Sequence, residues 1–411
     1  MSEFSNDPFK YYHFERLEDV ADRISEVLQC PITIEDINHR LLAYSTHDES
    51  TDPARISTII RRRVPEKVIN SLWKDGTIPK LLSTDEPIRV SQIDEVGLGN
   101  RIAISIWKND EVLGFIWALE INKHLKEEEL MLLKKAAQAV KNKLLNLQIR
   151  KTKKAERNQE FFWKLLTGHI STEVEINEGF QELNLHLPIP FSIVVFKFPH
   201  KLNEAAERKL SYLLQTTQQV NIVLYTVDFD ELIILLSAKS DAPLTDIRLF
   251  TLFTIRQLNE RFTFTNVTAS IGGISTQPLF IEKSYKEALA VLTIKNRFPS
   301  ETHELHSFSE MGIYQYLDIL YEQRKQQGLM NYSLQKLIDY DKHHKTNLVQ
   351  TLEIFLDNDS HVHDASKALN IHVNTLNYRL KRITEISELN LKSLNQKMTI
   401  YLDIKLDRMS L

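Results

Sequence analysis

The chain has 411 residues, enough for two to four domains. Hydrophobic residues make up 42% of it and charged residues 26%, which supports packed cores and excludes a disordered protein. The formal net charge is −4, so any contact with nucleic acid must come from a local basic patch rather than from the whole surface. The single cysteine, Cys30, excludes internal disulfides and cysteine-based zinc sites.

No targeting signal is expected in the first residues of the given sequence. Residues 1–7 have neither the basic start nor the apolar stretch of a signal peptide. No apolar run in the chain approaches the roughly 20 residues that a membrane helix needs. We therefore expect a cytoplasmic protein without membrane contact.

Helical and strand-like segments alternate through residues 1–125. Apolar residues at helical spacing predict a helix over 17–28, and polar helical sequence follows at 52–72, where Pro65 is expected to open a second helix. Strands are predicted at 30–37, 41–45, 87–90, 101–107 and 112–120. This order predicts an α/β domain with a central antiparallel sheet, which resembles the GAF-type ligand-binding fold.

The segment 52–63 is rich in arginine and is a candidate binding site for a small molecule. An arginine beside a sheet can clamp a carboxylate through two hydrogen bonds. Tryptophan side chains could supply apolar walls, and a carboxylate could meet an ammonium group. The candidates are Asp52, Arg55, Arg62, Trp107, Trp117 and Glu120. The alternative is a surface helix with solvated arginines.

A long helix is predicted over residues 126–166, which contain neither proline nor glycine. Apolar positions within it step by three and four residues, at Leu130, Leu133, Ala137, Val140, Leu144 and Leu147, before a basic run at 150–154 interrupts the pattern. This heptad seam predicts a coiled-coil-like helix that pairs two subunits. The alternative is that the helix closes its own sensor domain.

Residues 167–307 predict a second α/β domain. Strands are expected at 190–198, 221–227, 231–236 and 268–274, with helices at 201–217, 242–261 and 284–296. This order resembles a degenerate nucleotide-cyclase domain of the GGDEF-related type.

The hairpin at 227–231 bears on catalysis. Asp228, Asp230 and Glu231 could hold a cation, but the turn lacks the glycines that let a backbone approach phosphate. We therefore prefer a solvated turn, and we read the Gly272-Gly273 pair as a strand end or bulge. No common catalytic template is present, and the histidines at 343, 344, 361 and 363 suit ordinary polar roles better than a metal site. We expect no catalytic residues, metal or cofactor.

Residues 308–411 are expected to be helical throughout, with two short helices joined by a tight turn. The first covers about 363–369, with Ala365, Ala368 and Leu369 on its apolar side. Asn370 suits the left-handed conformation that ends a helix. The predicted N-cap of the second helix is Asn374 or Thr375.

The second of these helices is a candidate DNA reader. Its Leu376, Leu380 and Ile383 face inward at helical spacing. Asparagine can pair with adenine edges in the major groove, and lysine or arginine neutralises phosphate. The candidate DNA-contacting residues are Lys367, His372, Val373, Asn374, Thr375, Asn377, Tyr378, Arg379, Lys381 and Arg382. The alternative is a helical bundle with an ordinary solvated face.

Two motifs resemble one family. Residues 372–383, HVNTLNYRLKRI, are similar to the signature H-x-N-T-L-x-Y-R-L-x-R-I that closes PucR/CdaR-type bacterial transcription regulators. Residues 284–289, SYKEAL, resemble a local signature of the family's middle domain. Val373 and Asn377 stand where the family often has arginine, and Ser387-Glu388 replaces a frequent Thr-Gly pair.

The resemblance implies a multidomain α+β protein: a GAF-like sensor (1–125), a dimerising helix (126–166), a degenerate cyclase-like domain (167–307) and an all-α C-terminal domain with a helix-turn-helix (308–411). It implies a non-enzymatic activator of a catabolic operon, a homodimer that meets operator DNA and RNA polymerase. The N-terminal region is similar to that of proline-utilisation activators, which suggests proline or a related amino acid as effector. The alternatives are an active nucleotide cyclase and a signalling adaptor that does not bind DNA.

Overall fold

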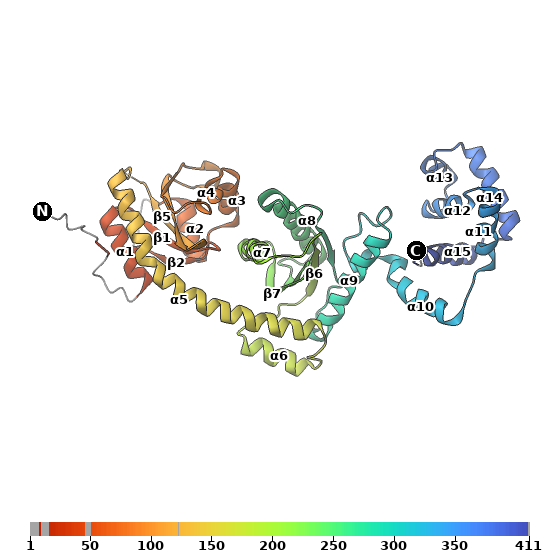
Figure 1. The fold of residues 1–411 in the computed structure, drawn as a ribbon, viewed down its shortest axis with the longest axis horizontal. Coiled ribbons are helices and arrows are strands. Elements are labelled where there is room, and N and C mark those ends of the chain that lie inside the picture. The colour runs from red at the N-terminus through yellow and green to blue at the C-terminus, as the bar shows by residue number, and fades with distance from the viewer. Residues whose placement is uncertain (1–7, 10–15, 46–50, 122, 410–411) are drawn as a thin grey trace. The chain divides into compact units, whose positions relative to one another are not determined.

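The computed structural model describes residues 8–9, 16–45, 51–121 and 123–409, apart from the side chains of residues 148–153 (Figure 1). Residues 1–7, for which no signal peptide was expected, therefore lie outside the described residues. The same holds for most side chains of the basic run at 150–154. The chain forms two compact units, residues 1–289 and 290–411. Within the described residues, no helix is both long enough and apolar enough to span a bilayer.

The first unit begins with a five-stranded antiparallel sheet. Its strands are β1 (Ile32–Asp36), β2 (Leu41–Tyr44), β3 (Ile88–Val90), β4 (Arg101–Lys108) and β5 (Glu111–Leu119), in the order β2-β1-β5-β4-β3. All five strands were predicted from the alternating pattern. Successive side chains point to opposite faces, so each strand contributes to two cores.

Helices cover both faces of this sheet. On one face, α1 (Leu17–Leu28) and the 40-residue α5 (Glu127–Leu166) pack against Ile34, Ile104 and Ile116. On the other face, α2 (Pro53–Arg61), α3 (Glu66–Lys74) and α4 (Thr77–Leu81) pack against Ala103, Phe115 and Trp117, and the 3-10 turn η1 (Asp94–Val96) lies nearby. The predicted helices are present, whereas α4 was not predicted.

The heptad seam of α5 is internal. Leu133, Ala137, Val140 and Leu144 are buried in the core that α5 shares with the sheet, and Leu130 and Leu147 pack against its edge. A seam that is buried within its own domain cannot also pair two subunits. The prediction of an intersubunit seam is therefore wrong at these positions, and the alternative, a helix that closes its own domain, is confirmed.

A second antiparallel sheet follows in the same unit. Its strands β6 (Phe191–Lys197), β7 (Asn221–Asp228), β8 (Glu231–Ser237) and β9 (Thr268–Ile271) lie in the order β7-β8-β6-β9. The helices are α6 (Glu173–Glu182), α7 (Glu204–Thr216), α8 (Pro243–Phe262) and α9 (Ile281–Arg297), with a 3-10 turn η2 (Pro278–Phe280). Of these α-helices, only α6 was not predicted. Its Phe180 ring packs on the Phe161 ring of α5, with the ring centroids 5.2 Å apart.

The Gly272-Gly273 pair packs closely against Ser284. The Ser284 hydroxyl donates to the Gly273 carbonyl at 2.9 Å and accepts from the Ile193 amide at 3.0 Å. A Cβ on Gly272 would lie 1.9 Å from the Ser284 carbonyl oxygen. The glycine is therefore required by the close approach of the chain after β9 to α9, which explains the serine of the local signature.

The second unit is helical, as predicted. It contains η3 (Phe308–Glu310), η4 (Gly312–Tyr316), α10 (Leu317–Gln327), α11 (Tyr332–His344), α12 (Leu348–Asp357), α13 (Val362–Ala368), α14 (Val373–Ser387) and α15 (Leu394–Arg408). Leu352, Leu376, Ile383 and Ile400 are fully buried at the centre of the bundle. This core fixes α13 and α14 on their supporting helices.

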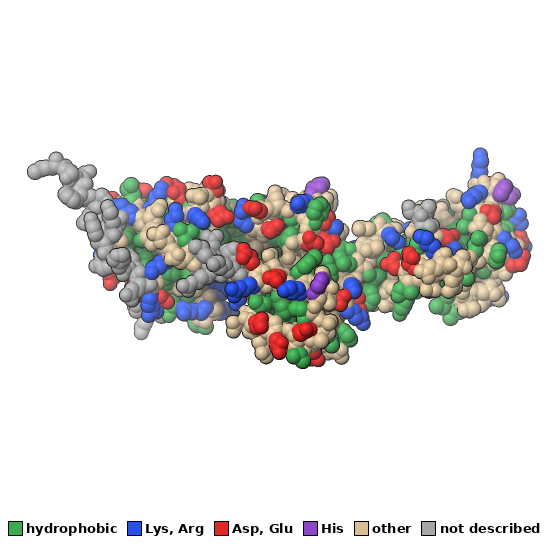
Figure 2. Space-filling model, turned by 60° about the horizontal axis from the view of Figure 1, so that its bottom comes forward, with side chains coloured by type: hydrophobic (Ala, Val, Ile, Leu, Met, Phe, Trp, Pro, Cys, Tyr) green, Lys and Arg blue, Asp and Glu red, His purple; other side chains and the backbone are tan. Residues whose placement is uncertain are grey.

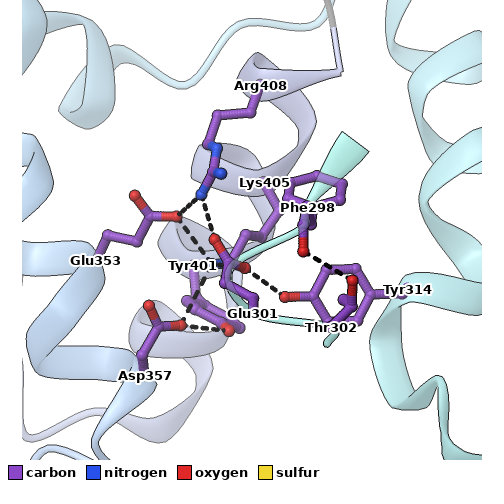
Figure 3. A network of polar contacts seen from close by, with 9 residues as sticks. All are labelled: Phe298, Glu301, Thr302, Tyr314, Glu353, Asp357, Tyr401, Lys405 and Arg408. Atoms are coloured by element: carbon purple, nitrogen blue, oxygen red, sulfur yellow. Dashed lines mark hydrogen bonds and ion pairs between the residues drawn. The ribbon is translucent and has the colours of Figure 1, made fainter. Parts of the chain in front are cut away.

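A buried lysine joins the segment after α9 to this bundle (Figure 3). The Lys405 side chain is 0% exposed and its ammonium donates to Glu301 at 2.7 Å, Glu353 at 2.8 Å and Asp357 at 3.3 Å. Arg408 also pairs with Glu301 and Glu353, and the Tyr314 hydroxyl donates to Glu301. The network thus anchors α12 and α15 to residues 301–314.

Candidate functional site

The turn between α13 and α14 has the geometry of a helix-turn-helix. Asn370 adopts the left-handed conformation (φ 53°), as predicted. The N-cap of α14 is His372, whose Nδ1 accepts from the Asn374 amide at 3.2 Å. The prediction of Asn374 or Thr375 as N-cap is wrong, because α14 begins earlier and both residues lie in its first turn. Ala368, predicted to face inward, is exposed.

The outward face of α14 is polar and open to solvent. Leu376 and Ile383 are buried and Leu380 is half-buried, which fixes the rotation of the helix. The exposed side chains are Lys367 of α13, the cap His372, and Asn374, Thr375, Asn377, Tyr378 and Lys381 of α14. Tyr378 is 71% exposed.

Two arginines of α14 contact their own bundle instead. Arg379 donates to the Thr351 hydroxyl at 3.2 Å. Arg382 donates to the Tyr340 hydroxyl at 3.3 Å, lies over that ring at 5.2 Å and pairs with Glu385 at 3.1 Å. Val373 is half-buried. Of the ten predicted DNA-contacting residues, these three are engaged with or partly covered by the bundle.

The five-stranded sheet carries a polar cavity on the face covered by α2 and α3. The cavity is small in this structure, with a volume of about 20 Å³. Because side chains alternate along strands, Thr33 and Glu35 of β1, Arg101 of β4 and Trp117 of β5 share this face. The other lining residues are Pro31, His39, Ala54, Arg55, Thr58, Val64, Val68, Leu72, Leu98 and Leu119.

Arg55 is buried in the cavity wall and only partly satisfied. It donates to the carbonyls of Ile32 at 2.9 Å and Ser45 at 3.1 Å, whereas its buried Nε has no partner among the described residues. Burial, followed by repulsion from Arg101, lowers the pKa of Arg55 to about 10. A bound carboxylate would relieve both penalties.

Asp52 is already engaged. Its carboxylate caps α2 by accepting from the Arg55 amide at 2.7 Å, accepts from the Gly99 amide at 2.9 Å and pairs with Arg101. Burial lowers the pKa of Arg101, although Asp52 opposes the shift. Asp52 therefore helps to position Arg55 and Arg101. It does not offer a free carboxylate to a ligand, which was the prediction from the sequence.

Glu35 supplies the carboxylate inside the cavity. It accepts from the Trp117 indole at 3.0 Å and lies 3.1 Å from Nδ1 of His39, whose Nε2 lies 3.0 Å from the Tyr212 hydroxyl of α7. Burial raises the pKa of Tyr212, so its hydroxyl keeps its proton. Because the Trp73 indole also donates to that hydroxyl at 3.0 Å, the tyrosine proton is free to point at His39. The cavity wall is thereby hydrogen-bonded to the middle domain.

Three predicted effector residues lie away from the cavity. Arg62 caps the end of α2 in a left-handed conformation and is exposed. The Trp107 indole donates to the Thr84 carbonyl at 3.1 Å. Glu120 accepts from the Leu125 amide at 2.7 Å. The sequence missed Glu35, His39 and Arg101. Glu35 alternates with apolar residues in β1, His39 lies in the turn after β1, and Arg101 is the first residue of β4, so only Glu35 carried a periodic signal.

The hairpin and the histidines have structural partners. Lys197 donates to Asp230 at 2.8 Å and to Glu231 at 2.9 Å, so this turn is ion-paired rather than simply solvated. His343 and His344 contact backbone carbonyls of α11. Over the residues that the structure describes, no group of three or more His, Cys, Asp or Glu is arranged to hold a metal ion.

Comparisons with known proteins agree with this architecture. Residues 348–406 match the PucR C-terminal helix-turn-helix domain, and residues 167–294 match a GGDEF-like domain. A crystal structure of a regulator of polyketide synthase expression from Bifidobacterium adolescentis is 13% identical, covering 62% of this chain and 93% of that one. Its TM-score of 0.31 is too low to bear on the fold.

Two curated relatives from Bacillus subtilis (strain 168) match over nearly their whole length. The DNA-binding transcriptional activator AdeR is 63% identical over 99% of this chain and 96% of its own. The proline-responsive transcriptional activator PutR is 29% identical over 97% of this chain and 98% of its own. An identity of 63% over almost the full length, together with the helix-turn-helix match, shows that the chain belongs to the family of PucR-type transcriptional regulators.

Proposed function

We propose that the chain is an operator-binding transcriptional activator whose sensor cavity responds to a small amino acid. The observation that carries the DNA-binding part is α14, a helix that is pinned by buried Leu376 and Ile383 and exposes asparagine, tyrosine and lysine on its other side. The second helix of a helix-turn-helix presents its N-terminal residues to base edges in the major groove. AdeR, at 63% identity, is itself a DNA-binding transcriptional activator.

The ten predicted DNA-contacting residues divide into two groups. Asn374 and Asn377 suit adenine edges, and Lys367, His372, Thr375, Tyr378 and Lys381 suit phosphate or base contacts from exposed positions. Arg379 and Arg382 hold the helix on its support, and Val373 is half-buried. Specificity therefore rests on the asparagines, and affinity on the exposed basic and hydroxyl groups.

The cavity chemistry suits an amino-acid zwitterion. On opening beyond the volume of about 20 Å³ that it has in this structure, the cavity could bring the unpartnered Arg55 guanidinium to a carboxylate, Glu35 to an ammonium group and Trp117 to an apolar side chain. Proline is the first candidate, because PutR is proline-responsive, followed by other small neutral amino acids. Occupancy would act on His39, and through its hydrogen bond on Tyr212 of the middle domain.

The remaining features fit the same proposal. The sensor would be GAF-like, and the protein would act in the cytoplasm as a homodimer that contacts RNA polymerase. The middle domain would transmit the signal without catalysis and without a cofactor, because its hairpin acids are ion-paired to Lys197. The dimer interface must then lie outside the internal α5 seam.

The test is operator binding by a double variant, Asn374→Ala with Lys381→Ala. Each base contact is worth about 1–3 kcal/mol, so affinity for DNA from the upstream region of the regulated operon should fall at least about tenfold. The matched control is Asn395→Ala with Lys392→Ala, which removes the same residue types from exposed positions around the start of α15. Unchanged operator affinity in the first variant, with both variants folded, would show that α14 is not the reader.

A further inference from the structure

A second, larger cleft lies in the first unit, away from the sensor cavity. Arg40 and Arg63 of the sensor domain, Lys154 and Asn158 of α5, and the first half of the edge strand β7 line it. Its volume is about 580 Å³. The other lining residues are Ala155, Gln159, Leu185, Leu214, Gln215, Thr217, Gln218, Val220 and Lys239, with 221–225 of β7.

Unsatisfied polar atoms gather at this cleft. Nε and Nη2 of Arg63, Oδ1 of Asn158 and Oγ1 of Thr217 are buried and have no hydrogen-bond partner among the described residues. The described residues contain eight buried side-chain atoms without a partner, and these are four of them. The four atoms come from three segments that are distant in the sequence. Buried polar groups are normally satisfied by protein, ordered water or a ligand, so such a concentration marks a place for ordered water or a polar ligand.

The charge of the cleft is of one sign. Four lining residues are cationic (Arg40, Arg63, Lys154 and Lys239), and none of the described lining residues is Asp or Glu. Burial, and then repulsion by Arg40, lowers the pKa of Arg63. The nearby carboxylates are engaged elsewhere: Glu66 accepts from the Gln218 amide at 2.6 Å, and Asp36 accepts from the Asn38 and Arg40 amides. Figure 2 shows lysine and arginine side chains grouped on the face that carries α5.

Apolar and aromatic residues that line the cleft suit an organic group. Leu185, Val220 and Leu224 are apolar, and the Tyr225 ring lines the same space, with its hydroxyl 2.8 Å from Ser211. A simple inorganic anion would leave this surface unused. A molecule that combines a multiply charged phosphate with a flat apolar part would use both sides.

We propose that this cleft binds a phosphorylated small molecule of nucleotide size, held by Arg63 and Arg40 through its phosphates. The site differs from the turn at which a cyclase hairpin would act, because the cleft is formed by residues 221–225 at the start of β7, whereas the turn lies at Phe229 and Asp230 beyond its end. It also differs from the sensor cavity, with which it shares no lining residue. The cleft touches the sensor domain, α5 and the middle domain, so its occupant would stabilise their contact.

The experiment is binding of pyrophosphate, ATP, GTP and citrate to the full chain by calorimetry, with thermal unfolding alongside. We expect a nucleotide to bind, pyrophosphate to bind more weakly, and citrate to bind least. Arg63→Gln and Arg40→Gln should each weaken the nucleotide roughly tenfold or more, the loss expected for one charge-assisted hydrogen bond. Arg61→Gln is the matched control, because Arg61 is exposed and does not line the cleft.

The loss of nucleotide affinity in Arg63→Gln should be accompanied by a characteristic effect on thermal stability. Without ligand, Arg63→Gln should unfold at the same or a higher temperature than the parent chain, because it removes a half-buried cation whose Nε and Nη2 have no hydrogen-bond partner among the described residues. Binding of none of the phosphate probes would overturn the proposal, as would nucleotide binding that is unaffected by both cleft variants. Operator binding by Arg63→Gln, measured without nucleotide, separates this result from the test of α14.

Discussion

At the scale of single residues, the buried Lys405 is the centre of an ion-pair network in the second unit. A buried ammonium is costly unless it is paired, and here three carboxylates and the face of Tyr401, 4.8 Å away, surround it. Burial would raise the pKa of Glu301, but hydrogen bonds from Lys405, Tyr314 and Arg408 outweigh it and hold that pKa below its usual value. The charged form of Glu301 therefore stabilises the fold.

The direction of the pH dependence follows from this shift. A carboxylate whose pKa is depressed by folding stabilises the protein above its unfolded pKa, about 4.3, and this contribution is lost as the pH falls through the folded pKa. Glu301→Gln should therefore destabilise the second unit by about 1–3 kcal/mol at pH 7, and the difference should shrink below about pH 4. Calorimetry of the full chain across pH measures it, with Glu322→Gln on α10 as an exposed control. A difference that does not change with pH would contradict this role of Glu301.

Individual site residues were only partly predictable from the sequence. Arg55 and Trp117 were identified and do line the cavity, whereas Arg101, Glu35 and His39 were not. Their role depends on register: Arg101 pairs with Leu119, and Thr33 with Trp117, across strands that lie far apart in the chain. No local pattern contains that register, so the cavity could be assembled only from the folded sheet.

At the scale of elements, α5 shows the limits of periodic patterns. Its apolar steps of three and four residues were read correctly as a helix with one apolar stripe. What covers the stripe cannot be read from the period, because a heptad seam and a helix packed on a sheet require the same spacing. The structure covers it with Ile104, Ile106 and Ile116 of the sensor sheet.

This assignment predicts the effect of a charge at the seam. Leu133 is fully buried, so Leu133→Asp should destabilise the first unit by about 4 kcal/mol or more. Met131→Asp, at a position that is 71% exposed, should change stability by less than about 0.5 kcal/mol. Thermal unfolding and light scattering measure both variants. A folded but monomeric Leu133→Asp chain, beside a dimeric parent, would restore the seam as a subunit interface.

The secondary structure followed from local rules, and the omissions share a cause. Every predicted strand is present, because each alternates or is continuously apolar between turn residues. The two missed helices, α4 and α6, are short and contain a proline or a glycine, so their local propensity is low. Packing decides them: Ile78, Leu81, Ile176 and Phe180 are buried.

At the scale of the whole molecule, hydrogen bonds and ring contacts join the two sheets of the first unit. The cavity beside the first sheet ends at His39, which stacks on Phe115 and contacts Tyr212 of the middle domain. Neighbouring contacts reinforce the join: Asn38 donates to Gln215 at 2.7 Å, and Arg261 lies over the Trp73 ring at 5.2 Å. A ligand that reorders the cavity wall would therefore act directly on α7.

The measurement that tests the account most directly is thermal unfolding of the full chain against proline, the other amino acids, ureides and sugar acids. A ligand that binds only the folded state adds about 2.7 kcal/mol at a hundredfold excess over its Kd. We predict that one small neutral amino acid raises the unfolding temperature of the parent chain and of Glu95→Gln, an exposed control, but not that of Glu35→Gln. Absence of a shift with every amino acid, or an equal shift in Glu35→Gln, would contradict the assignment of the cavity as the amino-acid sensor.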